Sequence, residues 1–139
     1  MSDLERYTIT MPRELLAAFD AWNARKGYKN RSEAIRDLVR AALVREEWTR
    51  PGARVAASLT LVYDHHVRSL TEKINALQHD HEGLVVSALH VHLDHHNCLE
   101  VIVLRGKAGE IQSLADALAC IKGVKHAQLT LTAEGKSLH

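Results

Sequence analysis

The sequence has 139 residues, a formal net charge of +1 and ten histidines. A chain of this length forms one domain or two very small ones, and two small domains usually gain stability by forming an oligomer. Two cysteines, no apolar leader and no long apolar run favour a soluble cytoplasmic protein over a disulfide-rich secreted protein or a membrane-spanning one. All ten histidines lie at or after His65, so the residues suited to metal chemistry fall in the second half.

The first segment with a clear pattern is residues 5–10, where polar and apolar side chains alternate. This pattern is typical of a short strand, whose polar face would carry Arg6, Thr8 and Thr10. A single short strand is not stable alone, because its backbone groups and its apolar face need partners. We therefore expect a second copy of the chain to supply the neighbouring strand.

Two helices are predicted after this strand. The first runs from about Pro12 to Lys26 and ends before Gly27, and the second begins at Asn30, which lies three residues before Glu33 as in a capping box. The second helix carries an apolar stripe of Ile35, Leu38, Val39, Ala42 and Leu43. The order strand, helix, helix is typical of a ribbon-helix-helix DNA-binding domain.

A DNA-reading role for this region has a simple physical basis. Two antiparallel strands form a ribbon that fits the major groove, where Arg6 can donate to guanine and the two threonines can contact base edges. The start of the second helix, at Asn30, Arg31 and Ser32, offers backbone N–H groups and a guanidinium to phosphate. The alternative is that these polar side chains only form a solvated face.

A domain boundary is predicted at Pro51-Gly52, which separates a domain of residues 1–50 from one of residues 51–139. The second domain shows the order strand, helix, strand, strand, helix, strand. The predicted elements are a strand over 55–63, a helix over 67–78, strands over 84–93 and 99–104, a helix after Gly106 and a strand over 124–131. This order predicts a ferredoxin-like fold, so the chain belongs to the α+β class.

Metal-binding chemistry is predicted on the hairpin between the two middle strands. His90 and His92 are two residues apart on one strand, and neutral imidazoles with the nearby Cys98 thiolate favour nickel, copper, zinc or cobalt over magnesium or calcium. If the turn spans 93–97, Cys98 lies opposite His92 on the same face of the sheet. A turn one residue shorter changes this parity, so that Cys98 no longer shares that face. The best candidate for a fourth ligand is His79.

Other residues near this hairpin receive different predictions. Asp94, His95 and His96 are expected in the turn, and Cys120 is expected in the core of the last helix. An enzyme with Cys98 as nucleophile and His92 or His96 as base is disfavoured, because no oxyanion-hole signal accompanies them. A ribbon-helix-helix repressor whose second domain senses another metal or a small molecule stays as an alternative.

The residues also carry a resemblance. Two segments, Asn30-Arg31-Ser32-Glu33-Ala34-Ile35-Arg36-Asp37 and Leu89-His90-Val91-His92 with Cys98-Leu99-Glu100, resemble the NikR family of nickel-responsive repressors in order and separation. The resemblance covers nearly the whole chain. It implies a ribbon-helix-helix domain joined to a ferredoxin-like, ACT-type domain in a homotetramer, and one square-planar nickel(II) per subunit held by His90, His92 and Cys98 of one chain and His79 of its neighbour.

The same resemblance implies the DNA contacts. The base-reading positions match Arg6, Thr8 and Thr10, and the phosphate-facing helix start matches Asn30, Arg31 and Ser32. Further matches are Glu33 and Asp37 for a second, weaker cation, and Arg68 for a DNA contact made by the metal-binding domain. The family implies repression of nickel-uptake genes at a palindromic operator, and the segment 79–83 is expected to respond to nickel.

Overall fold

The computed structural model describes residues 3–139, and residue contacts divide the chain into two units. The N-terminal unit reaches to Leu43 and includes His139, and the C-terminal unit is Val44–Leu138. The second helix, Arg31–Trp48, spans this division. Within residues 3–139, no helix combines the length and the apolar composition needed to cross a membrane.

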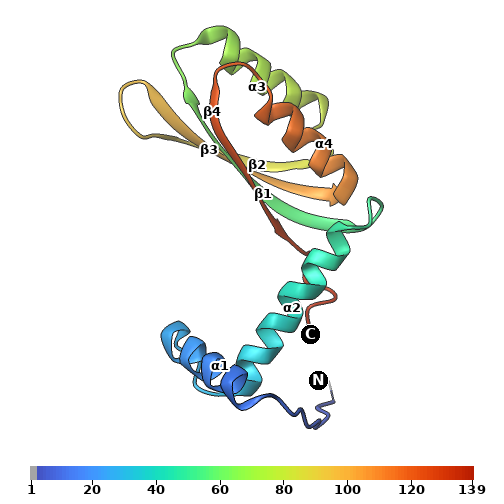
Figure 1. Cartoon of the computed structure of the whole chain (residues 1–139). Coiled ribbons are helices and arrows are strands. Elements are labelled where there is room, and N and C mark those ends of the chain that lie inside the picture. The colour runs from blue at the N-terminus through green and yellow to red at the C-terminus, as the bar shows by residue number, and fades with distance from the viewer. Residues whose placement is uncertain (1–2) are drawn as a thin grey trace. The chain divides into compact units, whose positions relative to one another are not determined.

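Two helices form the N-terminal part of the chain, α1 (Arg13–Lys26) and α2 (Arg31–Trp48) (Figure 1). α1 ends at Gly27, whose φ of 85° lies in the left-handed region that glycine adopts without strain. The backbone N–H of Glu33 donates to the Asn30 side-chain oxygen at 2.9 Å. This contact is half of the capping box that the sequence predicted at the start of α2.

The predicted strand over residues 5–10 is not formed in the single chain, where these residues lie in neither helix nor strand and are all exposed. It stays a prediction for a pair of chains, the state in which it was expected. A strand exists only where its backbone N–H and C=O groups pair with another strand, and this segment has no such partner within its own chain. Apolar side chains of the N-terminal unit are also exposed, namely Leu4, Tyr7, Ile9, Leu15, Leu38, Val39 and Leu43.

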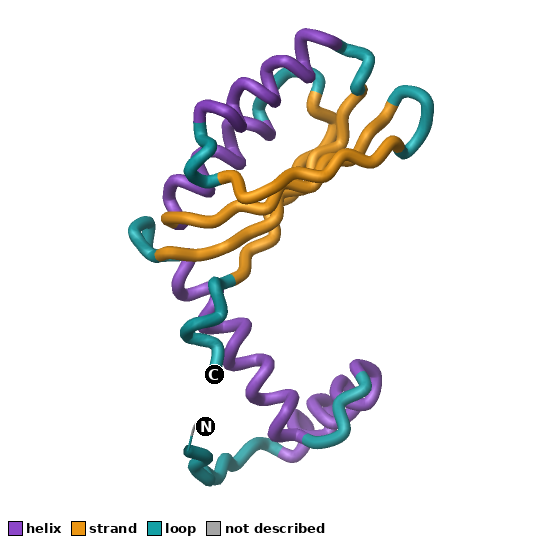
Figure 2. Tube along the Cα trace, turned by 180° about the vertical axis from the view of Figure 1, so that it is seen from behind, coloured by secondary structure: helices purple, strands orange, loops and turns teal. Residues whose placement is uncertain are grey.

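The C-terminal unit contains a four-stranded antiparallel sheet with strand order β2-β3-β1-β4. Helices α3 and α4 lie on one face of this sheet (Figure 1), and the orange strands of Figure 2 form the layer beneath them. The chain order β-α-β-β-α-β confirms the predicted ferredoxin-like arrangement. The elements are β1 (Arg54–Asp64), α3 (Arg68–Asp80), β2 (Val85–His92), β3 (Asn97–Lys107), α4 (Ala108–Ala119) and β4 (Val124–Thr132).

Alternation along the two central strands builds the core. In β1 every second residue from Val55 to Tyr63 is buried, and in β3 the same is true from Cys98 to Leu104. These side chains point toward the helix-covered face, where they pack against buried residues of α3 and α4 such as Ile74 and Ile111. The edge strand β2 is mostly exposed, with its histidines at the end of the hairpin.

Cys120 is an exception to the predicted core. It is exposed and lies at the C-cap of α4, where its backbone N–H donates to the Asp116 carbonyl. The buried stripe of α4 includes Leu114 and Leu118, and Cys120 falls two residues after Leu118, off the spacing of three or four that defines this face. The prediction of a buried Cys120 was therefore wrong.

Candidate metal centre and nucleic-acid interface

The β2–β3 hairpin determines which predicted ligands share a face. β2 ends at His92 and β3 begins at Asn97, and His92 lies directly opposite Cys98 in the antiparallel ladder. His90 lies opposite Glu100, two positions further along. Residues directly opposite in such a ladder project to the same side, so His90, His92 and Cys98 share the helix-covered face. This is the first of the two registers considered from the sequence.

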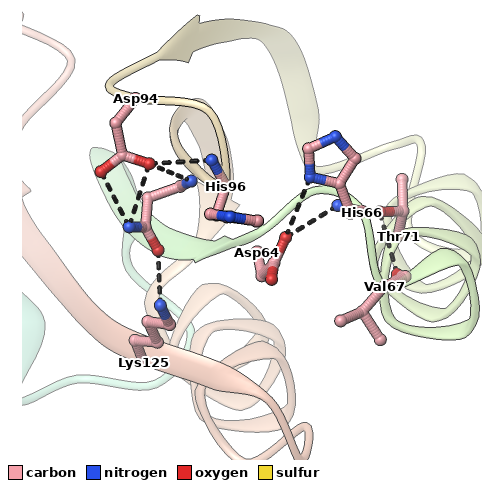
Figure 3. Close-up of polar contacts among 8 residues, drawn as sticks. Asp64, His66, Val67, Thr71, Asp94, His96 and Lys125 are labelled. Carbon is pink, nitrogen blue, oxygen red and sulfur yellow. Dashed lines mark hydrogen bonds and ion pairs between the residues drawn. The ribbon is translucent and has the colours of Figure 1, made fainter.

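Asp94 holds the turn that determines this register. Its carboxylate accepts hydrogen bonds from the backbone N–H groups of His96 at 2.9 Å and of Asn97 at 2.7 Å, and from the Asn97 side-chain amide at 2.9 Å (Figure 3). The Asn97 side chain and these backbone donors lower the pKa of Asp94 far below its usual range. A turn fixed in this way resists the one-residue slip that would turn Cys98 to the opposite face.

A buried carboxylate, Glu100, lies beneath the histidine strand. It accepts hydrogen bonds from the Tyr63 hydroxyl at 2.6 Å and the Gln78 amide at 2.7 Å, and it lies 2.9 Å from Nε2 of His90. These contacts compensate the cost of burying a charged group. They also engage one ring nitrogen of His90 and leave Nδ1 for another partner, as in metal sites where a carboxylate orients a histidine ligand.

Cys98 itself is fully buried, and burial raises the pKa of its thiol. In the metal-free chain the sulfur therefore keeps its proton at neutral pH. Because a thiolate is the species that binds a metal, binding at Cys98 would release this proton.

His92 is positioned by another histidine. The rings of His65 and His92 stack with centroids 4.4 Å apart and planes within 2° of parallel. His65 follows the end of β1, and its Nδ1 is buried without a hydrogen-bond partner among the described residues. Burial, followed by the neighbouring histidines, lowers the pKa of His65, which keeps the ring neutral at pH 7.

The predicted metal ligands of one chain do not converge on a common point. Among residues 3–139, His79, His90, His92 and Cys98 provide no group of three ligand atoms within 4.8 Å of one another. His79 is exposed in the last turn of α3. The donor types fit a borderline or soft divalent ion.

A hollow of about 700 Å³ lies elsewhere on the C-terminal unit and does not contain these ligands. Its single histidine, His81, places Nδ1 2.9 Å from the Leu77 carbonyl oxygen. The hollow offers no converging set of metal ligands. The candidate metal ligands therefore lie on the hairpin and not in this hollow.

The predicted DNA-contacting side chains at the N-terminus are all exposed: Arg6, Thr8, Thr10, Asn30, Arg31 and Ser32. Two of them already have local roles. Asn30 caps α2, and Arg31 binds both carboxylate oxygens of Asp20, with N–O distances of 2.8 Å. Asp20 of α1 thus holds the guanidinium of Arg31 in place. The remaining N–H groups of this guanidinium are left for another acceptor.

The positions predicted for a second cation are occupied by local contacts as well. One oxygen of Asp37 accepts from the Tyr28 hydroxyl at 2.6 Å and the other from Arg40 at 3.0 Å. Glu33 is exposed on the first turn of α2. Arg68, the first residue of α3, pairs with Glu72 at 2.9 Å and is nine-tenths exposed.

Sequence reasoning assigned no role to Tyr63, Gln78 and Glu100. The sequence does contain one indication that Glu100 is buried. It occupies the same alternating positions as Cys98, Ile102 and Leu104, and those three residues are all apolar. A carboxylate at a position that faces the core needs hydrogen-bond donors that are also buried. The partners Tyr63 and Gln78 come from β1 and α3, and nothing in the local sequence identifies them.

The sequence matches two family models. One is "Ribbon-helix-helix protein, copG family" over residues 5–46, and the other is "NikR C terminal nickel binding domain" over residues 56–132. Proteins described as "Putative nickel-responsive regulator" from Geobacter sulfurreducens and Geobacter metallireducens are 52% and 51% identical, over all 139 residues of each chain. A relative with the same description from Solibacter usitatus is 49% identical over 99% of both chains.

A solved structure also resembles part of the chain. The structure of an uncharacterized protein from Thermotoga maritima matches this chain with a TM-score of 0.51 and 18% identity. The match covers 56% of this chain and 96% of the other chain. At this level of identity the similarity shows the fold alone.

These findings define the class first: a transcriptional regulator in which a ribbon-helix-helix domain precedes a metal-binding domain, and not an enzyme. The chain belongs to the NikR family of nickel-responsive regulators. The resemblance stated from the sequence, the α+β fold class and the prediction that the protein is not an enzyme are confirmed.

Proposed function

We propose that the protein is a nickel-dependent repressor in which His90, His92 and Cys98 hold one nickel(II) per subunit together with His79 of a neighbouring subunit. The observation that carries this proposal is the register of the hairpin, which sets His92 opposite Cys98 with His90 on the same face. The fourth ligand is assigned to His79 of another chain because the resemblance to the family implies it; among residues 3–139 of one chain, the four residues bring no three ligand atoms together. Imidazole and thiolate are donors that nickel(II) accepts readily.

Glu100 prepares the proposed site before any metal binds. Its contacts with Tyr63 and Gln78 fix the carboxylate, which in turn fixes the ring of His90. The stacked His65 limits the rotation of His92 in the same way. Ligands whose orientation is set in advance lose less entropy on binding a metal, so these contacts support a high affinity.

The proposed DNA-binding unit is a dimer. Two copies of residues 5–10 would pair as a ribbon and display Arg6, Thr8 and Thr10 to the major groove, and the exposed apolar side chains of α2 would cover one another. A two-fold symmetric protein of this kind recognises a palindromic operator.

Phosphate contacts are assigned to the start of α2, where Asn30, Arg31 and Ser32 lie, and to Arg68 of the metal-binding domain. Asp20 supports this role for Arg31, since it holds the guanidinium in a fixed orientation. Glu33 and Asp37 are assigned to a second, weaker cation, for which Asp37 would exchange its present contact with Arg40.

Regulation follows from the shared metal site. The proposed tetramer is a dimer of dimers, and nickel held between subunits alters DNA affinity only if its binding differs between competing arrangements of the tetramer. The segment 79–83, which includes the end of α3 and the turn after it, would be ordered by the metal. The genes repressed would be those of nickel uptake.

The decisive test is a gel shift with the metal-free full-length protein and a palindromic DNA selected from a random pool. Nickel(II) should tighten binding strongly, and zinc(II) and copper(II) serve as comparisons. Arg6→Ala should weaken the preference for the selected sequence in the presence of nickel, because a base contact is lost. Equally tight binding without any metal would exclude the nickel switch and favour a regulator that senses another ligand.

The ligand assignment has its own readout. A thiolate bound to nickel(II) gives a charge-transfer absorption band, which Cys98→Ala should remove. Cys120→Ala is the matched control, because this second thiol is exposed at the end of α4, and it should keep the band. A band that survives Cys98→Ala would contradict the assignment.

A further inference from the structure

A short segment after β4 is bound to the last turn of α2. We call this segment, residues 133–138, the C-terminal strap; it forms neither helix nor strand. The indole N–H of Trp48 donates to the carbonyl of Thr132, the last residue of β4, at 2.9 Å, and the Ser137 hydroxyl donates to the Glu47 carboxylate at 2.8 Å. All of these residues belong to the C-terminal unit. The strap therefore returns the chain from the sheet to the end of α2.

Glu134 anchors the strap to the central strands of the sheet. Its carboxylate lies 3.0 Å from Nε of Arg105, near the end of β3, and 4.0 Å from Nε of Arg54, the first residue of β1. The hydrogen bond from Arg105 lowers the pKa of Glu134, so the carboxylate is charged at neutral pH. Only 12% of this side chain is exposed, so solvent screens its ion pairs less than it screens a pair at the open surface.

Polar contacts, and not a packed core, attach the strap. No residue of 133–138 belongs to the buried core of the C-terminal unit or to the apolar side chains packed against it. A hollow of about 290 Å³ remains beside the strap, lined by Glu47, Arg54, Arg105, Glu134, Lys136 and Ser137. Polar groups at such a place can exchange their contacts for water at small cost. The strap can therefore detach and reattach while the core stays intact.

We infer that the C-terminal strap is a conformational device that fixes the last turn of α2 to β3. Two connections join this turn to the sheet, the short covalent link at residues 49–53 and the strap. With the strap attached, Glu47 and Trp48 are held from the side of β4 as well as through the chain itself. With the strap released, the covalent link and the partial burial of Trp48 are what remains to orient the turn.

The strap also gives β3 a route to α2. β3 carries both Cys98 and Arg105, and α2 is one helix from Arg31 to Trp48 that spans the division between the two units. A shift of β3 can thus reach α2 through Arg105 and Glu134. Attached and released forms are two states, and metal binding alters DNA affinity through them only if it favours one form. This regulatory role rests on the proposed function, whereas the anchoring of α2 does not.

The experiment on the anchoring uses the full-length protein with Trp22→Phe, which leaves Trp48 as the single tryptophan. The double variant Glu134→Ala and Ser137→Ala removes both side-chain anchors. It should shift the emission of Trp48 to longer wavelength, because the indole becomes more accessible to water. Amide hydrogen exchange over residues 45–50 should become faster by about tenfold, since the anchors no longer oppose local opening. Glu110→Ala, at an exposed glutamate of the first turn of α4, is the matched control and should change neither signal.

The regulatory role has a separate readout, in which the anchors are removed from the otherwise wild-type protein. The double variant should keep its affinity for nickel(II), read from the charge-transfer band, because neither changed residue is a proposed ligand. The tightening of DNA binding by nickel(II) should fall at least about fivefold, the lower end of ordinary coupling between two sites.

The possible results separate the anchoring, the regulatory role and the proposed function. Unchanged Trp48 emission and unchanged exchange in the double variant would overturn the strap as an anchor of α2. Altered emission with undiminished tightening by nickel would overturn its regulatory role. A wild-type protein whose DNA binding ignores nickel would overturn the proposed function and the regulatory role together, and the emission of Trp48 would still decide the anchoring.

Discussion

The two units of the chain bury their apolar residues to very different extents. The C-terminal unit has a continuous core contributed by β1, β3, α3 and α4. The N-terminal unit buries Ala34 and Asn23 among its described residues, and it leaves Leu38 45% exposed and Ile9 59% exposed. One unit is therefore stabilised by its own core, whereas the other leaves apolar surface that its own residues do not cover.

This difference explains why the candidate metal ligands are positioned in the single chain and the candidate DNA-binding strand is not. The hairpin that presents His90, His92 and Cys98 is held by the sheet and by Glu100, so the orientation of these residues is set within the unit. The predicted ribbon has no such support, because its backbone hydrogen bonds would all go to a second chain.

The largest expected effect comes from the core of the C-terminal unit. Leu61 is fully buried in β1, so Leu61→Ala should lower the free energy of unfolding of this unit by about 2–5 kcal/mol, through lost burial and the cavity left behind. Urea denaturation read by hydrogen exchange over the sheet measures the change. Leu131→Ala, at a position 39% exposed in β4, is the control and should cost much less. Similar losses in the two variants would contradict the core described here.

A smaller effect is expected from the apolar surface of the N-terminal unit. If a second copy covers Leu38, then Leu38→Ala should weaken dimer formation by about 1.5–3 kcal/mol per chain, which is the value of burying one such side chain. Sedimentation equilibrium over a range of protein concentrations measures this change. Arg36→Ala, an exposed polar position of the same helix, is the control. An unchanged dissociation constant in Leu38→Ala would mean that the dimer uses another surface.

The sequence predicted the metal-binding domain well because its patterns are local. Alternation in β1 and β3 and the apolar spacing of α4 follow from packing onto one core, and the observed elements match the predicted ones to within a few residues. The strand at residues 5–10 could not be verified in one chain, because its partner is not part of that chain.

The contacts around the candidate site were harder to predict because they join distant segments. Glu100 receives hydrogen bonds from residues 37 and 22 positions away. Sequence spacing gives the direction of a side chain within its own strand. It does not give the strand or helix that will face it.

The Glu100 network provides a prediction of intermediate size. Tyr63→Phe should destabilise the C-terminal unit by about 1.5 kcal/mol, because a buried carboxylate loses one donor but keeps the other two. It should also weaken nickel binding, since the carboxylate that orients His90 becomes less fixed. Denaturation and a nickel competition titration measure the two effects. Tyr7→Phe, whose side chain is exposed in the other unit, should leave both unchanged. If Tyr63→Phe lowers stability without changing nickel affinity, Glu100 stabilises the fold only.

The smallest effect is expected for the exposed pair of Asp20 and Arg31 in the N-terminal unit. The hydrogen bonds from Arg31 lower the pKa of Asp20 below its ordinary value of 3.8, so the charged carboxylate is favoured in the folded state. The stabilisation is fully present above that ordinary value and is lost as the pH falls through the lowered pKa of the folded state. Thermal unfolding of the wild type and of Asp20→Asn should therefore differ slightly near neutral pH and converge in acid. Glu14→Gln, an acidic position of the same helix without an ion pair among the described residues, should lack this convergence. A difference between wild type and Asp20→Asn that persists at the lowest pH would show that Asp20 acts through something other than its charge.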